Sequence, residues 1–449
     1  MEVKGIQPPS WVRKAVFYQI FPDRFRNGDP RNDPPYVRPW GEAPTPTSLF
    51  GGDLWGILEK LDYLDSLGVS ALYLTPIFRA STNHRYDTED YFQVDPVLGG
   101  DQALKTLVFE LHRRGMRIIL DGVFNHCGSG HPFFRDAKEK GPFSPYFDWF
   151  VWEEEEPGYS CWAGCPTLPE WNHDNPKVRE YLLSVVRYWL VHFEIDGWRL
   201  DTVEYLPPDF VREIYNTVKA VNPEAYVLGE VMGLGTPWFR HRALDGVMNY
   251  RLWEALVQFF AKEAWDSHRF CRYLWSLWRS YPSWANFSSY NLLGSHDKPR
   301  FLTLAGGDMR RVILAAAFLF SYPGAPAIYY GDEVGLEGGE DPDCRRCFPW
   351  QEAKEEHPLL SAFQRFARWR REEEALVSGG LRFLQAFRRA FLLCRPHPSG
   401  DVLLAVNAGN EEVELALPSG EFREKESGES FFGTLRLLPY SFALLKRVL

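Results

Sequence analysis

Eight short apolar runs alternate along the chain with longer segments in which apolar side chains recur at helical spacing. The runs, which have the character of buried strands, cover 16–22, 69–74, 116–120, 196–200, 225–229, 244–248, 289–294 and 325–330. The segments of helical periodicity cover 53–67, 101–114, 176–193, 209–221, 251–277 and 308–320. Strands that alternate with helices form a parallel sheet. Eight such units predict an α/β protein built on a (β/α)8 TIM barrel.

Two parts of the chain break this alternation. Residues 124–174, after the third strand, are irregular and rich in Pro, Gly and aromatic residues, with an acidic run at 153–156. An insertion this long is usually a functional lid or a small subdomain, so we expect it to overhang the pocket mouth. From residue 376 onward, short apolar runs separated by turn residues predict a C-terminal antiparallel β-sandwich. The predicted divisions are a barrel over 1–123 and 175–375, an inserted subdomain over 124–174 and a β-sandwich over 376–449.

Polar clusters follow five of the predicted strands. They cover 121–126, 197–201, 229–230, 295–297 and 331–333. In a barrel of parallel strands every C-terminal strand end opens onto the same face, so these residues converge on one pocket. A single Asp or His after a strand is more often a cap or an ion-pair partner. Five clusters together predict an active site.

Asp201 and Glu230 are suited to glycoside hydrolysis with retention of configuration. That reaction needs one carboxylate as nucleophile and one carboxylic acid as proton donor, about 5–5.5 Å apart. The two residues end neighbouring predicted strands, which lie about 4.8 Å apart in a sheet. Arg199 lies two residues before Asp201, so the pleat points both side chains the same way and the guanidinium can keep the carboxylate ionised. Glu230 would need burial to raise its pKa and hold its proton.

Asp297 follows the seventh predicted strand and supplies a third carboxylate, suited to binding sugar hydroxyls and distorting the ring. His126 and His296 are natural hydrogen-bond donors beside it. The chain also holds 17 Trp, 21 Tyr and 33 Phe, or 16% aromatic residues. Most of these rings are expected to fill the core, but a flat ring also suits the C–H face of a sugar. A pocket that combines carboxylates with rings predicts a carbohydrate ligand.

Charge and hydropathy exclude other classes of partner. The formal net charge of −10 argues against nucleic acid and against an anionic membrane surface, because both select basic patches. Residues 1–9 lack the apolar core of a secretory signal, and no run approaches the roughly 20 apolar residues that span a bilayer. We therefore expect a cytosolic protein that binds neither nucleic acid nor a membrane.

Four sequence segments carry a resemblance to a known family. They are Asp-Gly-Val-Phe-Asn-His at 121–126, Gly-Trp-Arg-Leu-Asp-Thr-Val-Glu-Tyr at 197–205, Gly-Glu-Val-Met at 229–232 and Leu-Gly-Ser-His-Asp at 293–297. In order and spacing they resemble the signature regions of the α-amylase family of glycoside hydrolases. The resemblance implies that the nucleophile is Asp201, the general acid/base Glu230 and the transition-state stabiliser Asp297. It further implies sugar-binding or supporting roles for Arg199, His126, His296 and Tyr86, the last as the ring under the sugar at the cleaved position.

Within that family the chain is most similar to the cyclomaltodextrinase, neopullulanase and maltogenic amylase group. The segments 21–30, 50–53, 168–172 and 341–347 carry this similarity. It implies that Asp341 and Arg345 bind the next sugar inward. The chain differs at 202–208, where the group usually has Val-Ala-Asn-Glu, and at Met232, where it often has Trp. Its first predicted strand begins near residue 16, without the N-terminal module through which relatives often pair, so the oligomeric state stays open.

A loop with four oxygen donors in seven residues predicts a structural calcium site. The donors are Asn27, Asp29, Asn32 and Asp33, and calcium prefers such clusters of hard oxygen ligands. In the resembling group a calcium site uses this loop together with positions that match Gly51 and Asp53. The alternative is an Asx-turn loop without an ion. An ion here would brace the loop after the first strand and would not touch the sugar.

Four of the seven cysteines form two close pairs on loops above the C-terminal face of the barrel. The pairs are Cys161 with Cys165 and Cys344 with Cys347. A four-thiolate zinc site, one or two disulfides, or free thiols are the alternatives. No cysteine is paired with a His of the five clusters, so none is a candidate nucleophile.

The leading hypothesis is a retaining α-glycoside hydrolase that cleaves α-1,4-glucosidic bonds through a covalent glycosyl-Asp intermediate. The family resemblance implies cyclodextrins and maltooligosaccharides as substrates, with pullulan or starch as further candidates. One alternative is a 4-α-glucanotransferase, in which a sugar hydroxyl replaces water at the intermediate. The other is a non-catalytic carbohydrate-binding relative.

Overall fold

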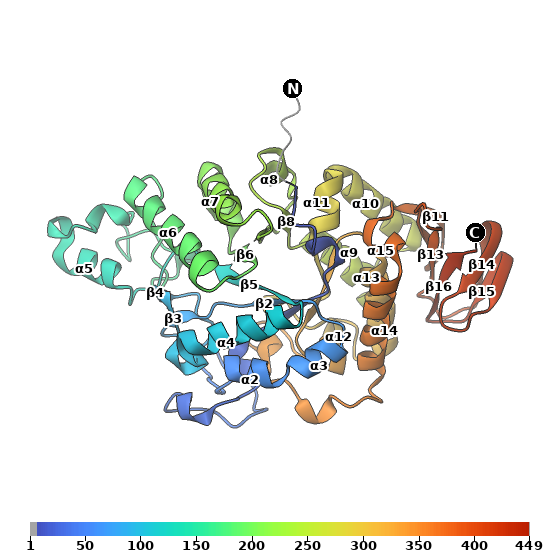
Figure 1. The fold of residues 1–449 in the computed structure, drawn as a ribbon, viewed down its shortest axis with the longest axis horizontal. Coiled ribbons are helices and arrows are strands. Elements are labelled where there is room, and N and C mark those ends of the chain that lie inside the picture. Colours follow the sequence, from blue (N-terminus) through green and yellow to red (C-terminus); the bar gives the residue numbers. More distant parts are fainter. Residues whose placement is uncertain (1–6, 449) are drawn as a thin grey trace.

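A closed barrel of eight parallel strands forms the centre of the molecule (Figure 1) in the computed structural model, which describes residues 7–448. The strands are β1 (Phe17–Ile20), β2 (Ala71–Leu74), β5 (Arg117–Gly122), β6 (Gly197–Leu200), β7 (Tyr226–Gly229), β8 (Gly246–Val247), β9 (Tyr290–Leu292) and β10 (Ala325–Tyr329). Their order is β8-β7-β6-β5-β2-β1-β10-β9. A parallel bridge between Met248 and Tyr290 joins the two ends. All eight predicted strands and the barrel itself are confirmed.

Helices surround the barrel. Those that follow the strands are α2 (Leu54–Glu59), α3 (Leu61–Ser66), α4 (Gly100–Arg113), α6 (Pro176–His192), α7 (Pro208–Val221), α9 (Tyr250–Leu256), α10 (Ser267–Ser280), α13 (Met309–Ser321) and α14 (Pro358–Glu372). Shorter ones are α1 (Pro22–Phe25), α8 (Thr236–Arg240), α11 (Ser283–Ser288), α12 (Phe301–Leu304) and α15 (Glu374–Ser378). None of the helices within residues 7–448 is both long and apolar enough to cross a membrane.

Two predicted helices are wrong as single elements. The segment 53–67 breaks at Lys60, which has non-helical angles of −104° and 11°, into α2 and α3. The segment 251–277 passes from α9 through a π-helical turn at Val257–Ala261, and Glu263 then adopts a φ of +54°. The chain re-enters a helix where the Asp266 side chain accepts from the backbone N–H of Arg269 at 2.7 Å. Buried apolar side chains lie on both sides of the break, at Phe260 and Ala261 before it and at Trp265 and Phe270 after it, so periodicity alone could not show it.

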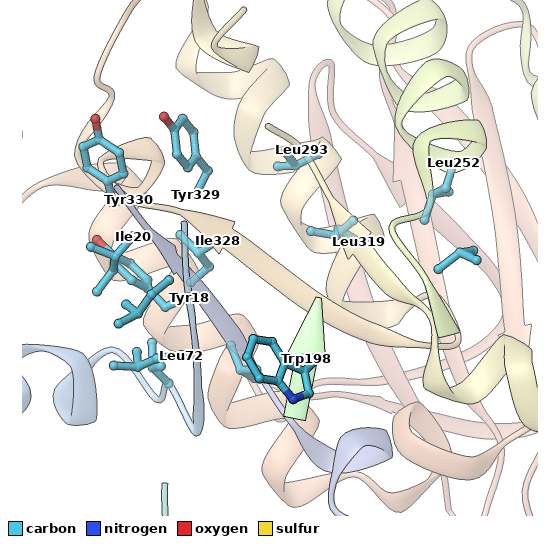
Figure 2. Packing of buried hydrophobic residues seen from close by; sticks show 14 of the residues in the cluster. Tyr18, Ile20, Leu72, Trp198, Leu252, Leu293, Leu319, Ile328, Tyr329 and Tyr330 are labelled. Carbon is cyan, nitrogen blue, oxygen red and sulfur yellow. The ribbon is translucent and has the colours of Figure 1, made fainter. Parts of the chain in front are cut away.

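Barrel strands alternate their side chains between two apolar layers. Phe17, Tyr73 and Leu228 belong to the cluster inside the barrel. Tyr18, Leu72 and Ile328 belong to the larger cluster between strands and helices, which Figure 2 shows from close by. This period of two also decides which residues near the strand ends point inward to the pocket.

Two structured excursions interrupt the barrel. An antiparallel hairpin, β3 (Phe78–Ala80) and β4 (Thr88–Val94), follows β2 and was not predicted from the sequence. The insertion after β5 carries α5 (Pro132–Lys140), which lies in Figure 1 at the end of the molecule opposite the C-terminal sheet. Stacked rings hold this insertion together: the centroids of Phe133 and Tyr146 are 4.1 Å apart.

The C-terminal part, predicted as a β-sandwich, is a separate domain of antiparallel strands. Its strands are β11 (Arg382–Phe387), β12 (Ala390–Arg395), β13 (Val402–Asn407), β14 (Val413–Glu424), β15 (Ser430–Leu437) and β16 (Ser441–Arg447). They form one hydrogen-bonded sheet in the order β11-β12-β13-β16-β14-β15. Leu393 and Leu404 on one face join the barrel's outer core, while Leu392 and Leu403 on the other join a core shared with β14 and β15. Residues 1–6 and 449, at the ends of the predicted divisions, lie outside the described residues.

Candidate active site

A cavity of about 430 Å³ opens at the C-terminal ends of the barrel strands. Eight of the nine residues expected to act on or bind sugar line it: Tyr86, His126, Asp201, Glu230, His296, Asp297, Asp341 and Arg345. Arg199, the ninth, does not line the cavity and is fully buried. The structure therefore gathers residues from five strand ends and two excursions around one space.

Strand register places the buried guanidinium of Arg199 between three carboxylates. Asp121 on β5 pairs in register with Arg199 on β6, and both point inward at alternate positions. The Nη1 atom of Arg199 lies 2.8 Å from Asp121 Oδ1 and 2.6 Å from Asp201 Oδ1. Its Nη2 atom lies 2.9 Å from Glu230 Oε2. One cation thus holds both predicted catalytic carboxyls, which consequently face the same point.

Burial has the largest effect on the pKa values of the three carboxyls around Arg199. It raises the pKa of Asp201 to about 7 and that of Glu230 to about 7, against the opposing attraction of Arg199. Burial also raises the pKa of Asp121 to about 6. Each carboxylate disfavours ionisation of its neighbours, so the Asp201–Glu230 pair releases its protons in two linked steps. Near neutral pH, one carboxyl of the pair can be charged while the other keeps its proton.

Thr202 connects the two carboxyls directly. Its backbone N–H donates to Glu230 Oε2 at 2.9 Å, and its hydroxyl donates to Asp201 Oδ2 at 3.3 Å. Its φ of 42° and ψ of 46° are left-handed, which is unfavourable for a β-branched residue. The surrounding structure holds this strained conformation, and the conformation aims the N–H at Glu230.

A second set of contacts forms the wall on the side of Asp297. His296 Nε2 lies 3.0 Å from Asp297 Oδ2 and 2.5 Å from the hydroxyl of Tyr86. The Tyr86 and His296 rings are stacked, with centroids 5.5 Å apart. Arg345 Nη2 lies 3.4 Å from Asp297 Oδ1, and its Nη1 lies 3.0 Å from Asp341 Oδ1. These five predicted residues are therefore one connected network.

The imidazole of His126 lines the cavity. Its Nε2 is buried and has no hydrogen-bond partner among residues 7–448. Burial lowers the pKa of His126 to about 3, so the ring is neutral at neutral pH. The ring of Trp162 from the insertion lies with its centroid 5.8 Å from that of His126.

Seven further residues line the cavity, and the sequence predicted no role for them. They are His84, Trp162, Leu168, Thr202, Glu204, Tyr205 and Met232. Beneath it, Tyr73 donates to Asp121 Oδ2 at 2.7 Å, and Gln19 Nε2 lies 2.7 Å from His296 Nδ1. Both of these lie on inward positions of β2 and β1, so strand parity could have identified them. The residues of the loops and the insertion carry no such periodic signal.

Six residues predicted to bind calcium lie on two adjoining loops and fit an ion only in part. Asn27 Oδ1 and Asn32 Oδ1 are buried without hydrogen-bond partners, and a Cβ on Gly51 would lie 2.5 Å from Asp33 Oδ1. Such free amide oxygens and close backbone suit a calcium ion. The Asp29 carboxylate, however, pairs with Arg31, and Asp53 Oδ1 accepts from the backbone of Gly56 at 2.6 Å as a helix cap.

Within residues 7–448 no three His, Cys, Asp or Glu side chains form a group that could hold a metal. A calcium ion would therefore depend on the amide oxygens of Asn27 and Asn32, the Asp33 carboxylate and backbone carbonyls, with Asp29 or Asp53 contributing less. The ion stays a prediction. The same finding gives no support to zinc on Cys161, Cys165, Cys344 and Cys347, and all seven cysteines are free thiols in the structure.

Removal of calcium is expected to lower the melting temperature by a few degrees and to leave kcat of the folded protein unchanged. The ion would bind only the folded state and would lie outside the cavity. Thermal melting with calcium and with excess chelator measures the first effect, and initial rates below the melting range measure the second. In the double variant Asn27→Leu, Asn32→Leu the chelator should have no further effect. An unchanged melting temperature for the unsubstituted protein would rule the ion out.

Comparisons with known proteins agree with this geometry. The model of the alpha amylase catalytic domain matches residues 19–374. A cyclomaltodextrinase of Geobacillus thermopakistaniensis is 45% identical over 421 residues, which are 92% of this chain and 72% of the relative. Neopullulanase 2 of Thermoactinomyces vulgaris is 42% identical over 393 residues, 86% of this chain and 67% of the relative.

A solved structure is similar over nearly its whole length. It is the cyclic α-maltosyl-(1→6)-maltose hydrolase of Arthrobacter globiformis, in complex with cyclic α-maltosyl-(1→6)-maltose. The two chains are 38% identical with a TM-score of 0.92, and the match covers 98% of this chain and 100% of the other.

Proposed function

Because the chain belongs to the α-amylase family of glycoside hydrolases, we propose that it cleaves α-1,4-glucosidic bonds of cyclodextrins and maltooligosaccharides with retention of configuration. The single observation that carries this proposal is the placement of Asp201 and Glu230 on one buried guanidinium. Retaining hydrolysis needs two carboxyls held close together in unlike protonation states. A non-catalytic binding protein would not need that arrangement.

In the proposed first step, Asp201 attacks the anomeric carbon while Glu230 gives its proton to the glucosidic oxygen. The carbon–oxygen bond breaks, the leaving sugar departs with the proton, and an ester joins the remaining sugar to Asp201. In the second step Glu230 takes a proton from water, whose oxygen attacks the same carbon and frees Asp201. Arg199 stabilises the carboxylates at the start and the end of each cycle.

The remaining predicted residues would bind the sugar. The Asp297 carboxylate, held by His296, would bind ring hydroxyls and favour the distorted sugar of the transition state. Tyr86 would stack under the sugar at the cleaved bond, and His126 would donate or accept through its free nitrogen. Asp341 and Arg345 would bind the next sugar on the same side.

Two further activities on related substrates have specific support. The hydrolase that matches over its whole length binds a ring with α-1,6 links, so hydrolysis of cyclic α-maltosyl-(1→6)-maltose is a second candidate. A 4-α-glucanotransferase differs only in the acceptor that attacks the ester. The open edge of the cavity, where Glu204, Tyr205 and Met232 are exposed, leaves space for a sugar acceptor. The oligomeric state and the cytosolic location stay predictions.

Parallel incubation of the pure protein with β-cyclodextrin, cyclic α-maltosyl-(1→6)-maltose, starch and pullulan tests the proposal. We expect β-cyclodextrin to be opened and cut to short oligomers such as maltose, with the α-anomer seen first by NMR. Starch cut much faster than the ring would contradict the cyclomaltodextrinase type. At high maltotriose, longer oligomers that appear early would identify a transferase, and no cleavage of any substrate would leave a binding protein.

A further inference from the structure

A second cavity, the α10–β11 groove, lies between the helix α10 and the first strand of the C-terminal sheet. Its volume is about 550 Å³, and it shares no lining residue with the active-site cavity. The backbone N–H of Ser267, at the start of α10, donates to the carbonyl of Arg388 at 2.9 Å and holds the helix beside the strand. Four residues at helical spacing line the groove from one face of α10: His268, Cys271, Arg272 and Trp275. The C-terminal sheet therefore leaves part of this helix face open.

The strand β11 turns an apolar side chain toward this opening. Its pairing with β12 shifts between Phe383 and Gln385, so Leu384 has no partner in the ladder. Leu384 lines the groove and is 39% exposed, and Trp275 from α10 also lines it and is 41% exposed. Two large apolar side chains thus contact water in one groove, and covering them with an apolar side chain would be favourable.

The α10–β11 groove is positively charged, although the whole chain carries a net charge of −10. Arg272 and Arg382 line it, and no acidic residue does. Neither guanidinium forms an ion pair with any residue between 7 and 448. Unpaired cations beside exposed apolar surface favour a partner that brings both carboxylates and an apolar side chain.

The insertion after β5 carries a segment with this chemistry, the acidic turn of residues 151–156. All four glutamates at 153–156 are exposed, and none forms an ion pair within the described part of the chain. The backbone N–H of Glu153 donates to the carbonyl of Gly158 at 3.1 Å, so the turn is folded back on itself. Val151 is exposed and lies two positions before Glu153, on the same side of an extended segment. The acidic turn therefore presents an apolar side chain next to unpaired carboxylates.

The groove and the acidic turn lie toward opposite ends of the molecule. The insertion lies at the end of the molecule opposite the C-terminal sheet, and α10 lies beside that sheet (Figure 1). Two copies placed side by side in opposite directions would each set their acidic turn against the groove of the other. Such a pair has two-fold symmetry and two identical contacts, so it closes at two copies.

We propose that the α10–β11 groove binds the acidic turn of a second copy of this chain, and that the two copies form a closed, two-fold dimer. Val151 of the second copy packs on Trp275, and the carboxylates of its acidic turn pair with Arg272 and Arg382. Exposed ion pairs are individually weak and are screened by salt. The two identical contacts therefore act together, and the dimer is sensitive to ionic strength.

Sedimentation velocity of the full chain over a range of concentrations tests this dimer. At low salt we expect a species of twice the 52.1 kDa of one chain and no larger one. Raising the salt from about 0.05 M to about 0.5 M should raise the dissociation constant Kd. The groove variant, Arg272→Glu with Arg382→Glu, should raise Kd by about 10-fold or more. The turn variant, Glu154→Arg with Glu155→Arg, should do the same.

A mixture of the groove variant and the turn variant should recover the dimer. In the mixed pair, the glutamates of the altered groove face the arginines of the altered turn, while the other contact is the original one. Arg212→Glu with Arg240→Glu is the matched control, because these exposed arginines of α7 and α8 lie outside the groove and form no ion pair within residues 7–448. Its Kd should equal that of the unsubstituted chain. Circular dichroism and thermal melting check that each variant is folded.

Three results would overturn the inference. The first is a chain that stays monomeric at low salt, which would leave the groove to a different acidic partner. The second is a dimer that neither variant weakens, or a mixture of the variants that stays monomeric. The third is a series of species larger than two that grows with concentration, because an open chain of copies would then replace the closed pair. These measurements use no substrate, so they do not depend on the proposed function.

Discussion

Replacement of Asp201 by Asn is expected to lower kcat by about 10⁴-fold or more, on maltotriose and on α-maltosyl fluoride alike. Asn keeps the size of the side chain and can still accept from Thr202, but it cannot form the ester with the anomeric carbon. The loss includes the fluoride because attack by Asp201 is required whatever the leaving group. Initial rates of reducing-sugar and fluoride release measure the effect.

The fold of the Asp201→Asn variant should be unaffected, because the ion pair between Arg199 and Asp121 at 2.8 Å remains. Removing one of several mutually repelling carboxylates is expected to raise the melting temperature slightly or leave it unchanged. Asp174→Asn, at an exposed position at the end of the insertion, serves as the matched control for activity. A variant that retained a tenth or more of the activity would contradict the role of Asp201 as nucleophile.

The barrel and the residues at its strand ends could be predicted because both follow from burial. Parallel strands covered on two faces become continuous apolar runs, so their positions are visible in the sequence. A polar residue directly after such a run lies at the C-terminal end of a strand, and these ends share one face of the barrel. The period of two then places Arg199 beneath Asp201, as the structure confirms with a 2.6 Å contact.

Other features could not be predicted because they depend on contacts between distant loops. The helix α14 has an apolar stripe that includes Leu359, Phe363 and Phe366, yet no predicted strand follows it, so alternation gave no reason to look for it. The 2.8 Å hydrogen bond that Glu204 accepts from the backbone N–H of Met232 requires two loops from different strands and the left-handed backbone of Thr202. Nothing in the local residue pattern indicates that a threonine adopts a φ of 42°.

The protonation of Asp201 and Glu230 could likewise be predicted only in part. The sequence predicted that burial would raise the pKa of Glu230, and the structure places it at about 7 for that reason. Burial also raises the pKa of Asp201 to about 7, although the Arg199 guanidinium lies beside that carboxylate. Two further carboxylates, Asp121 and Asp297, add repulsion that a single sequence motif does not reveal.

Replacement of Glu230 by Gln is expected to separate the two halves of the reaction. On maltotriose kcat should fall by about 10²–10⁴-fold, because the leaving oxygen no longer receives a proton. On α-maltosyl fluoride the first step needs no proton donor, so the variant should release a burst of about one fluoride per active site. Slow release should follow, because no base activates water at the ester. Stopped-flow detection of fluoride measures both phases.

The direction in which the rate changes with pH tests the same role of Glu230 as the acid. Glu230 must carry its proton to act on maltotriose, so kcat/KM of the unsubstituted protein should fall as pH rises through about 7, the raised pKa of that carboxyl. At low pH it should fall again as Asp201 becomes protonated. On the fluoride, kcat/KM of the unsubstituted protein should show only the acidic fall, since the first step then requires Asp201 ionised but no proton on Glu230. An alkaline fall of equal size on both substrates, or Glu230→Gln without a burst, would contradict Glu230 as the acid and leave another group to supply the proton.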